Sequence, residues 1–179
     1  MTNARRSRAL VIDASVAAAA GRTDHPVSKA CRDFLEAVLK ICHHVVLTRE
    51  IRQEWNKHQS NFTALWRSSM YARKKVARPQ VDRNDVLRTG IANSNLSHNE
   101  CEEVLKDVHL VEAALAADLL LASLDDTARA SFRKIAHEVG SLQQVVWVNP
   151  AKDDERAVQW LGEGARDEES RRLGSDEAV

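Results

Sequence analysis

The sequence predicts an α/β fold of three layers, in which helices cover both faces of a short and mainly parallel central sheet. Short apolar runs that suit strands alternate along the chain with segments whose apolar residues recur at helical spacing. Gly and Pro are scarce, at 6 and 3 of 179 residues, so helices should predominate. With 44% hydrophobic and 29% charged residues, the composition excludes collagen-like, disordered and disulfide-rich proteins.

The strands are predicted from continuous apolar runs, which are typical of strands buried on both faces of a parallel sheet. Each run is only three to five residues long, and polar or turn-forming residues follow it. Asn149-Pro150, for example, ends the last one. The predicted strands are Ala9–Ile12, Val45–Leu47, Leu119–Ala122 and Gln144–Val148.

The helices are predicted from capping residues that precede helical periodicity. Thr48 should open the helix that contains Glu54, and Ser97 with Glu100 forms a capping box. Asp107 should begin a separate helix, and Asp125 or Asp126 should cap the next. Residues 60–100 are predicted as a helical insertion. The predicted helices cover about residues 29–42, 62–78, 83–91, 98–105, 108–117, 126–138 and 153–161, and the helix after Thr48 is predicted to include Ile51, Glu54 and Trp55.

One domain over residues 1–162 is expected, with residues 163–179 as an acidic, disordered tail. The basic N-terminus before the run Ala9–Ala20 imitates a signal peptide, but Asp13 inside that run opposes insertion. No other stretch approaches 18 uncharged apolar residues, so a cytoplasmic protein without a membrane partner is expected. The three scattered cysteines lack a CxxC pair and indicate reduced thiols.

Charge is balanced overall but unevenly distributed. Residues 49–90 hold ten Lys and Arg against four Asp and Glu, whereas residues 100–150 hold four against nine. This distribution suits a basic surface for a nucleic-acid backbone beside an acidic pocket, although solvated helix faces would give the same pattern. The residues predicted to contact nucleic acid are Arg49, Arg52, Arg73, Lys74, Lys75 and Arg78.

Acidic residues follow the predicted strands where a parallel sheet places its ligands, outside the carboxyl ends of the strands. Asp13 follows the first strand and Asp125 the third, while Glu54 and Asp107 lie on neighbouring helices. Two carboxylates 4 Å apart repel each other by roughly 4 kcal/mol at an effective dielectric of about 20. A hard divalent cation removes that repulsion. A Mg²⁺ or Mn²⁺ site is therefore predicted at this edge.

At these residues the chain resembles a PIN domain, the nuclease module of VapC-type toxins. The resemblance spans about residues 8–150 and rests on the order and spacing of four segments, Leu10–Ser15, Val46–Glu54, Asp107–Leu115 and Leu120–Asp125. It implies an endoribonuclease that cleaves RNA phosphodiester bonds with Mg²⁺ or Mn²⁺. It also implies the toxin half of a toxin–antitoxin pair, with an antitoxin protein and a homodimer as partners.

The resemblance assigns roles residue by residue. Asp13, Glu54, Asp107 and Asp125 would be catalytic, and Ser15 and Ser123 would support the site with their hydroxyls. The metal would be held by Asp13, Asp107 and Asp125, with Asp126 as the alternative to Asp125. The sequence leaves open which of these two is the deeper ligand, and whether RNA or DNA is preferred.

Two other interpretations remain. The first is a non-catalytic PIN-like protein that binds nucleic acid or serves as a scaffold. The second, a phosphotransfer receiver, fits poorly because only Asp13 lies near the first strand and Lys152 lies beyond Pro150. The histidines are interpreted as structural or surface residues. His109 in particular lies two positions after Asp107 and should point elsewhere on a helix.

Overall fold

A five-stranded, entirely parallel sheet forms the centre of the protein in the computed structural model, which describes residues 7–176. The strand order is β3-β2-β1-β4-β5. The predicted α/β fold with a parallel sheet is thus confirmed. The strands are β1 (Ala9–Ile12), β2 (His44–Val46), β3 (Val76–Ala77), β4 (Leu120–Ala122) and β5 (Val146–Val148).

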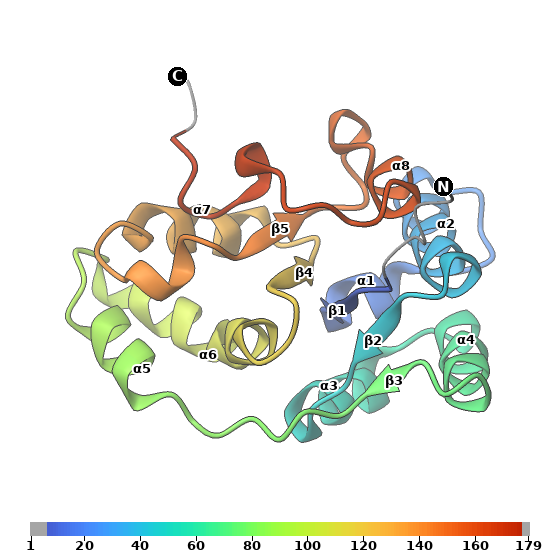
Figure 1. The fold of residues 1–179 in the computed structure, drawn as a ribbon, viewed down its shortest axis with the longest axis horizontal. Coiled ribbons are helices and arrows are strands. Elements are labelled where there is room, and N and C mark those ends of the chain that lie inside the picture. Colours follow the sequence, from blue (N-terminus) through green and yellow to red (C-terminus); the bar gives the residue numbers. More distant parts are fainter. Residues whose placement is uncertain (1–6, 177–179) are drawn as a thin grey trace, which may run out of the picture.

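Helices cover both faces of this sheet. Helices α2, α4 and α8 lie on one side and α5, α6 and α7 on the other (Figure 1). Within the described residues, no helix has the length and apolar character needed to cross a membrane. The helices are α1 (Ala14–Ala19), α2 (Pro26–Ile41), α3 (Arg49–His58), α4 (Asn61–Ala72), α5 (Asp85–Ala92), α6 (His98–Leu115), α7 (Asp126–Ile135) and α8 (Ala157–Gly162).

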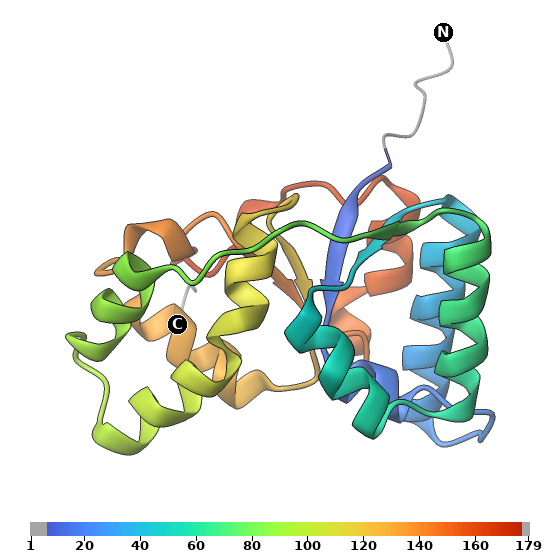
Figure 2. The ribbon, with the colours of Figure 1, turned by 90° about the horizontal axis from the view of Figure 1, so that it is seen from below.

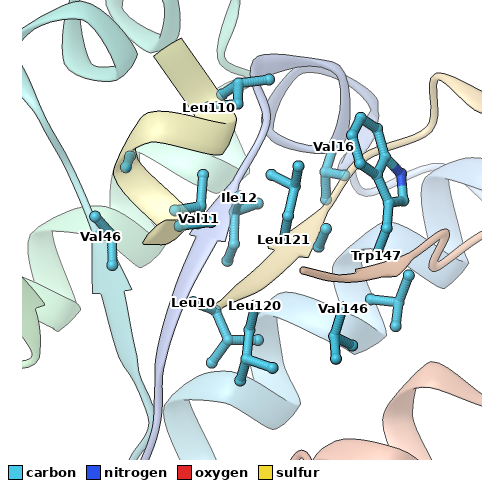
Figure 3. Close-up of a cluster of buried hydrophobic side chains, with 14 of the residues drawn as sticks. Leu10, Val11, Ile12, Val16, Val46, Leu110, Leu120, Leu121, Val146 and Trp147 are labelled. Atoms are coloured by element: carbon cyan, nitrogen blue, oxygen red, sulfur yellow. The ribbon is translucent and has the colours of Figure 1, made fainter. Parts of the chain in front are cut away.

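The apolar strands make the core, as the uninterrupted apolar runs predict. Leu10, Val11 and Ile12 of β1 are fully buried, and Figure 3 shows side chains from β1, β4 and β5 packed together. Burying one such side chain contributes about 1.5–3 kcal/mol. The Nε1 of Trp55 donates to the Ile12 carbonyl oxygen over 2.9 Å, so this buried indole is satisfied and joins α3 to the end of β1.

Several capping predictions are confirmed. The Thr48 hydroxyl accepts from the Ile51 amide at the start of α3, and Ser97 and Glu100 form the capping box of α6. Asp125 caps α7, because its Oδ1 accepts from the Ala128 amide over 2.8 Å. For α5 the cap is Asn84 rather than Asp82.

The predicted helix over residues 62–78 ends early, at Ala72. The Lys74 backbone has φ +57°, and the Lys75 amide donates to the Met70 carbonyl oxygen, so the chain turns sharply out of the helix. Residues 76–77 then pair with β2. The segment 60–100 is therefore not a separate helical insertion, since it supplies an edge strand of the sheet.

Helix α6 is continuous from His98 to Leu115, so Asp107 lies in its interior and does not begin a new helix. An aspartate need not cap a helix. The apolar residues before and after Asp107 lie on the same face of α6, so the helix continues through this position.

The C-terminal segment also differs from the prediction of a disordered tail. Residues 163–176 run beside β5, where the Leu173 amide donates to the Val145 carbonyl oxygen over 2.8 Å and the Leu173 side chain is 1% exposed. Arg172 and Arg171 pair with Asp167 and Glu168. Arg5 and Arg6 of the basic N-terminus, and residues 177–179 of the predicted tail, lie outside the described residues.

Candidate active site

The candidate site lies where the strand order reverses. Strands β1 and β4 are neighbours in the sheet, but the chain leaves β1 toward β2 on one side and leaves β4 toward β5 on the other. The carboxyl ends of the strands at such a switch point form the usual ligand crevice of an open parallel sheet. In Figure 2, α1, α3 and the connection after β4 gather around these ends.

Asp13 lies directly at this switch point. It follows β1 and its amide donates to the Ala122 carbonyl oxygen of β4 over 2.9 Å. Its carboxylate Oδ2 accepts from the Ser15 hydroxyl over 2.5 Å and from the Ser123 hydroxyl over 2.8 Å. Both serines predicted to support the site therefore hold the same carboxylate oxygen.

The two hydroxyls also accept hydrogen bonds and so join the loops that follow β1 and β4. The Leu124 amide donates to the Ser15 Oγ over 3.2 Å, and the Asp125 amide donates to the Ser123 Oγ over 3.1 Å. Each hydroxyl thus donates its proton to Asp13 and accepts from a backbone amide of the loop after β4. The orientation of Asp13 is fixed by the loop that carries Asp125.

Asp107 reaches the same place from α6. Its pKa is raised from 3.8 to about 6, first by burial and then by the negative charges of Asp13 and Asp125. Glu54 raises the pKa of Asp107 further, whereas His109 opposes the shift. Since such interactions weaken with distance, Asp13, Asp125 and Glu54 lie within electrostatic range of Asp107.

Glu54 has a partner that sequence reasoning missed. Its Oε2 lies 3.1 Å from the Nε2 of His109, and the Nδ1 of His109 lies 2.9 Å from the Lys106 carbonyl oxygen. Helix α3 approaches α6, which gives His109 a contact on another helix. Spacing along α6 alone could not reveal this contact, because it depends on how two helices from distant segments pack.

The geometry favours Asp125 over Asp126 as a member of the acidic cluster. Asp126 Oδ2 accepts from the side-chain amide of Asn149 over 3.0 Å and lies 3.2 Å from the ammonium nitrogen of Lys152. Asp126 is not among the charges that shift the pKa of Asp107, whereas Asp125 is. Asp126 is thus engaged with the segment after β5.

The predicted basic residues fall into two groups. Arg49 and Arg52 are exposed at the start of α3, and Arg78 follows β3, so these three lie at the carboxyl edge of the sheet with the acids. Arg73, Lys74 and Lys75 precede β3 and lie at the opposite edge, because all strands run parallel. The charge count along the sequence had assigned all six residues to one surface, because it carries no information on which edge of the sheet a residue occupies.

A small pocket of about 110 Å³ adjoins the site through His109. Arg88 on its wall donates from Nε and Nη2 to the two carboxylate oxygens of Glu112, each over 2.8 Å. Burial would raise the pKa of Glu112, but these bonds and the Asn84 amide bring it below its ordinary value. The pocket is lined by Thr48, Glu50, Val81, Arg83, Arg88, His109 and Glu112.

Within residues 7–176, no three His, Cys, Asp or Glu side chains stand close enough to enclose a metal ion as they lie. Mg²⁺ is commonly held by one or two carboxylates and keeps several of its waters. Burial first, and then the charges of Asp13 and Asp125, disfavour the ionised form of Asp107 and raise its pKa, and an ion bound partly through water would offset these effects. The donor set is all oxygen and suits Mg²⁺ or Mn²⁺.

Comparisons with known proteins identify no relative. No protein-family model, no curated protein and no solved structure matches the chain.

Proposed function

We propose that this protein is a metal-dependent endoribonuclease with a PIN-like fold. The observation that carries the proposal is the Asp13 carboxylate, which the Ser15 and Ser123 hydroxyls hold at the loop that carries Asp125. Burial and the charges of Asp13 and Asp125 raise the pKa of Asp107 to about 6, and such shifts are typical of functional sites. The position of these residues at the switch point of the sheet supports the same conclusion.

The chain's own residues have separable tasks in this proposal. Asp13, Asp107 and Asp125 would hold Mg²⁺ or Mn²⁺, which supplies an acidified water and offsets charge on the phosphodiester. Ser15 and Ser123 keep the Asp13 carboxylate oriented toward the loop after β4. The Glu54 side chain is 40% exposed, so a general base at this position would be in contact with bulk water.

The substrate would be held by cations at the same edge of the sheet. Arg49 and Arg52 are exposed there, and the Arg78 guanidinium lies 5.0 Å from the centre of the Tyr71 ring. These groups suit the phosphates of a single RNA strand, whose binding is electrostatic and sensitive to salt. The role of toxin, an antitoxin partner and a homodimer follow from the family resemblance and belong to the same proposal.

The test is cleavage of total RNA by the purified protein with Mn²⁺ or with EDTA, followed by mapping of the cut ends. Asp13→Asn should abolish metal-dependent cleavage while the circular dichroism spectrum is unchanged. Glu103→Gln is a matched control, because it removes a carboxylate from α6 whose side chain is 70% exposed. Equal cleavage by Asp13→Asn and the wild type would refute the site.

The second candidate is a non-catalytic PIN-like protein that binds nucleic acid. It is favoured by the absence, among the described residues, of three ligand side chains placed to enclose an ion. It predicts RNA binding that is the same with Mn²⁺ and with EDTA, and no new RNA ends under either condition.

A further inference from the structure

We infer that His109 is a positioning residue, which holds the Glu54 carboxylate beside Asp107 in the acidic cluster through the hydrogen bond between its Nε2 and Glu54 Oε2. The inference rests on the proposed function for its consequence, metal binding. The contact itself is a property of the metal-free protein and can be tested separately.

The imidazole of His109 lies between two acceptor oxygens. Nδ1 lies 2.9 Å from the Lys106 carbonyl oxygen, one turn earlier on α6, and Nε2 lies 3.1 Å from Glu54 Oε2. The ring is also shielded, with its side chain 13% exposed. Donation from Nε2 to the Glu54 carboxylate is the way in which a second residue orients a ligand or base.

Glu54 depends on this contact more than the other acids depend on any one partner. The Asp13 carboxylate has two hydroxyl donors, and Asp125 accepts from the Ala128 amide. For the Glu54 carboxylate, the contact with His109 is the only hydrogen bond or ion pair within residues 7–176. Its side chain is 40% exposed, so without His109 it would be free to turn into solvent.

The contact also joins two helices that are distant in sequence. Glu54 lies on α3, which follows β2, and His109 lies on α6, which precedes β4. Asp107 lies two positions before His109, and the negative charges of Asp13, Asp125 and Glu54 raise its pKa. His109 therefore ties the acid supplied by α3 to the helix that supplies Asp107.

The first arm of the test measures Mn²⁺ affinity by isothermal titration calorimetry. His109→Leu removes the donor and should weaken Mn²⁺ binding about 10-fold or more, because Glu54 then no longer adds its negative charge to the cluster that would hold the ion. His109→Gln keeps a donor near the position of Nε2 and should stay within about threefold of the wild type. His98→Leu is the matched control on α6, since that histidine is 85% exposed.

The second arm is a double-mutant cycle in EDTA, with His109→Leu and Glu54→Ala alone and together, followed by urea denaturation. If the two side chains interact, the shifts of the denaturation midpoint will not add. In the Glu54→Ala background, His109→Leu should also cause no further loss of Mn²⁺ affinity. Additive midpoint shifts, or a folded His109→Leu protein that binds Mn²⁺ like the wild type, would overturn the inference.

The two arms separate this inference from the proposed function. A wild-type protein that does not bind Mn²⁺ would refute the metal site and, with it, the role of His109 in metal binding. The cycle in EDTA would still decide whether His109 holds Glu54. Loss of Mn²⁺ affinity in His109→Leu together with non-additive midpoints supports both.

Discussion

The Ser123 hydroxyl donates to the Asp13 carboxylate over 2.8 Å, although 110 positions separate the two residues along the chain. The same hydroxyl accepts from the Asp125 amide over 3.1 Å. One buried oxygen atom therefore aligns two of the acids assigned to the site. Its loss should affect both stability and chemistry.

Ser123→Ala should lower the free energy of unfolding by about 1–2 kcal/mol, because the Asp125 amide loses its acceptor and Asp13 loses a donor. Metal-dependent RNA cleavage should fall about 10-fold in kcat. Urea denaturation and initial rates measure the two effects. Ser68→Ala is the control, since that exposed hydroxyl bonds only to a carbonyl oxygen of its own helix. If Ser123→Ala is destabilised but cleaves RNA like the wild type, Ser123 contributes to folding and not to the site.

Asp107→Asn should stabilise the metal-free protein at pH 7.5. The pKa of Asp107 is raised in the folded state, from 3.8 to about 6, so its charged form disfavours folding at neutral pH. The gain should be of order 1 kcal/mol, because solvent screens this half-buried carboxyl. Denaturation in EDTA across a pH series measures it.

The stabilising effect of Asp107→Asn should decrease as the pH falls. As the pH falls through about 6, Asp107 in the folded wild type takes up a proton and the repulsion is relieved. The advantage of Asp107→Asn should therefore shrink below pH 6 and vanish below the ordinary pKa of 3.8. An advantage that persists at pH 3.5, or that is absent at pH 7.5, would contradict the raised pKa.

Asp125→Asn and Asp126→Asn should differ in their effect on cleavage. Asp125 interacts electrostatically with Asp107, whereas Asp126 contacts Asn149 and Lys152. We expect Asp125→Asn to reduce kcat by at least 100-fold and Asp126→Asn by less than threefold, in single-turnover assays with Mn²⁺. The reverse order would identify Asp126 as the ligand.

RNA affinity should depend on the edge of the sheet at which a cation lies. Arg49→Ala with Arg52→Ala should weaken binding and reduce the slope of log affinity against log salt by about 0.7 for each phosphate that is no longer neutralised. Arg73→Ala with Lys75→Ala removes the same charge at the opposite edge and should leave both quantities unchanged. Fluorescence anisotropy with a single-stranded RNA, over a salt series, distinguishes the two. An equal reduction of affinity in both double variants would place the RNA elsewhere.

Local chemistry made much of this fold predictable from the sequence. The apolar runs mark four of the strands, because strands buried on both faces must be apolar throughout. Thr48 and Ser97 mark helix starts, because their hydroxyls satisfy free amides close in sequence. The acids were assigned to one site because the carboxyl ends of parallel strands share one edge.

The remaining features depend on contacts between distant segments. Strand β3 has two residues, Val76 and Ala77, too few to show any periodicity. Lys74 and Lys75 precede this strand and so lie at the edge of the sheet opposite the acids. A sequence analysis that does not detect the strand cannot assign these cations to that edge. The partner of His109 lies 55 positions away on another helix, where no spacing rule applies.

The pairing of β1 with β4 also sets when the site can exist. Asp13 emerges from the ribosome early, but the hydroxyl and the two later acids that complete its surroundings lie beyond position 106. A nascent chain that has not yet released β4 has no assembled cluster, and pairing so distant in sequence is slow to form. A nuclease built in this way would be silent throughout most of its own translation.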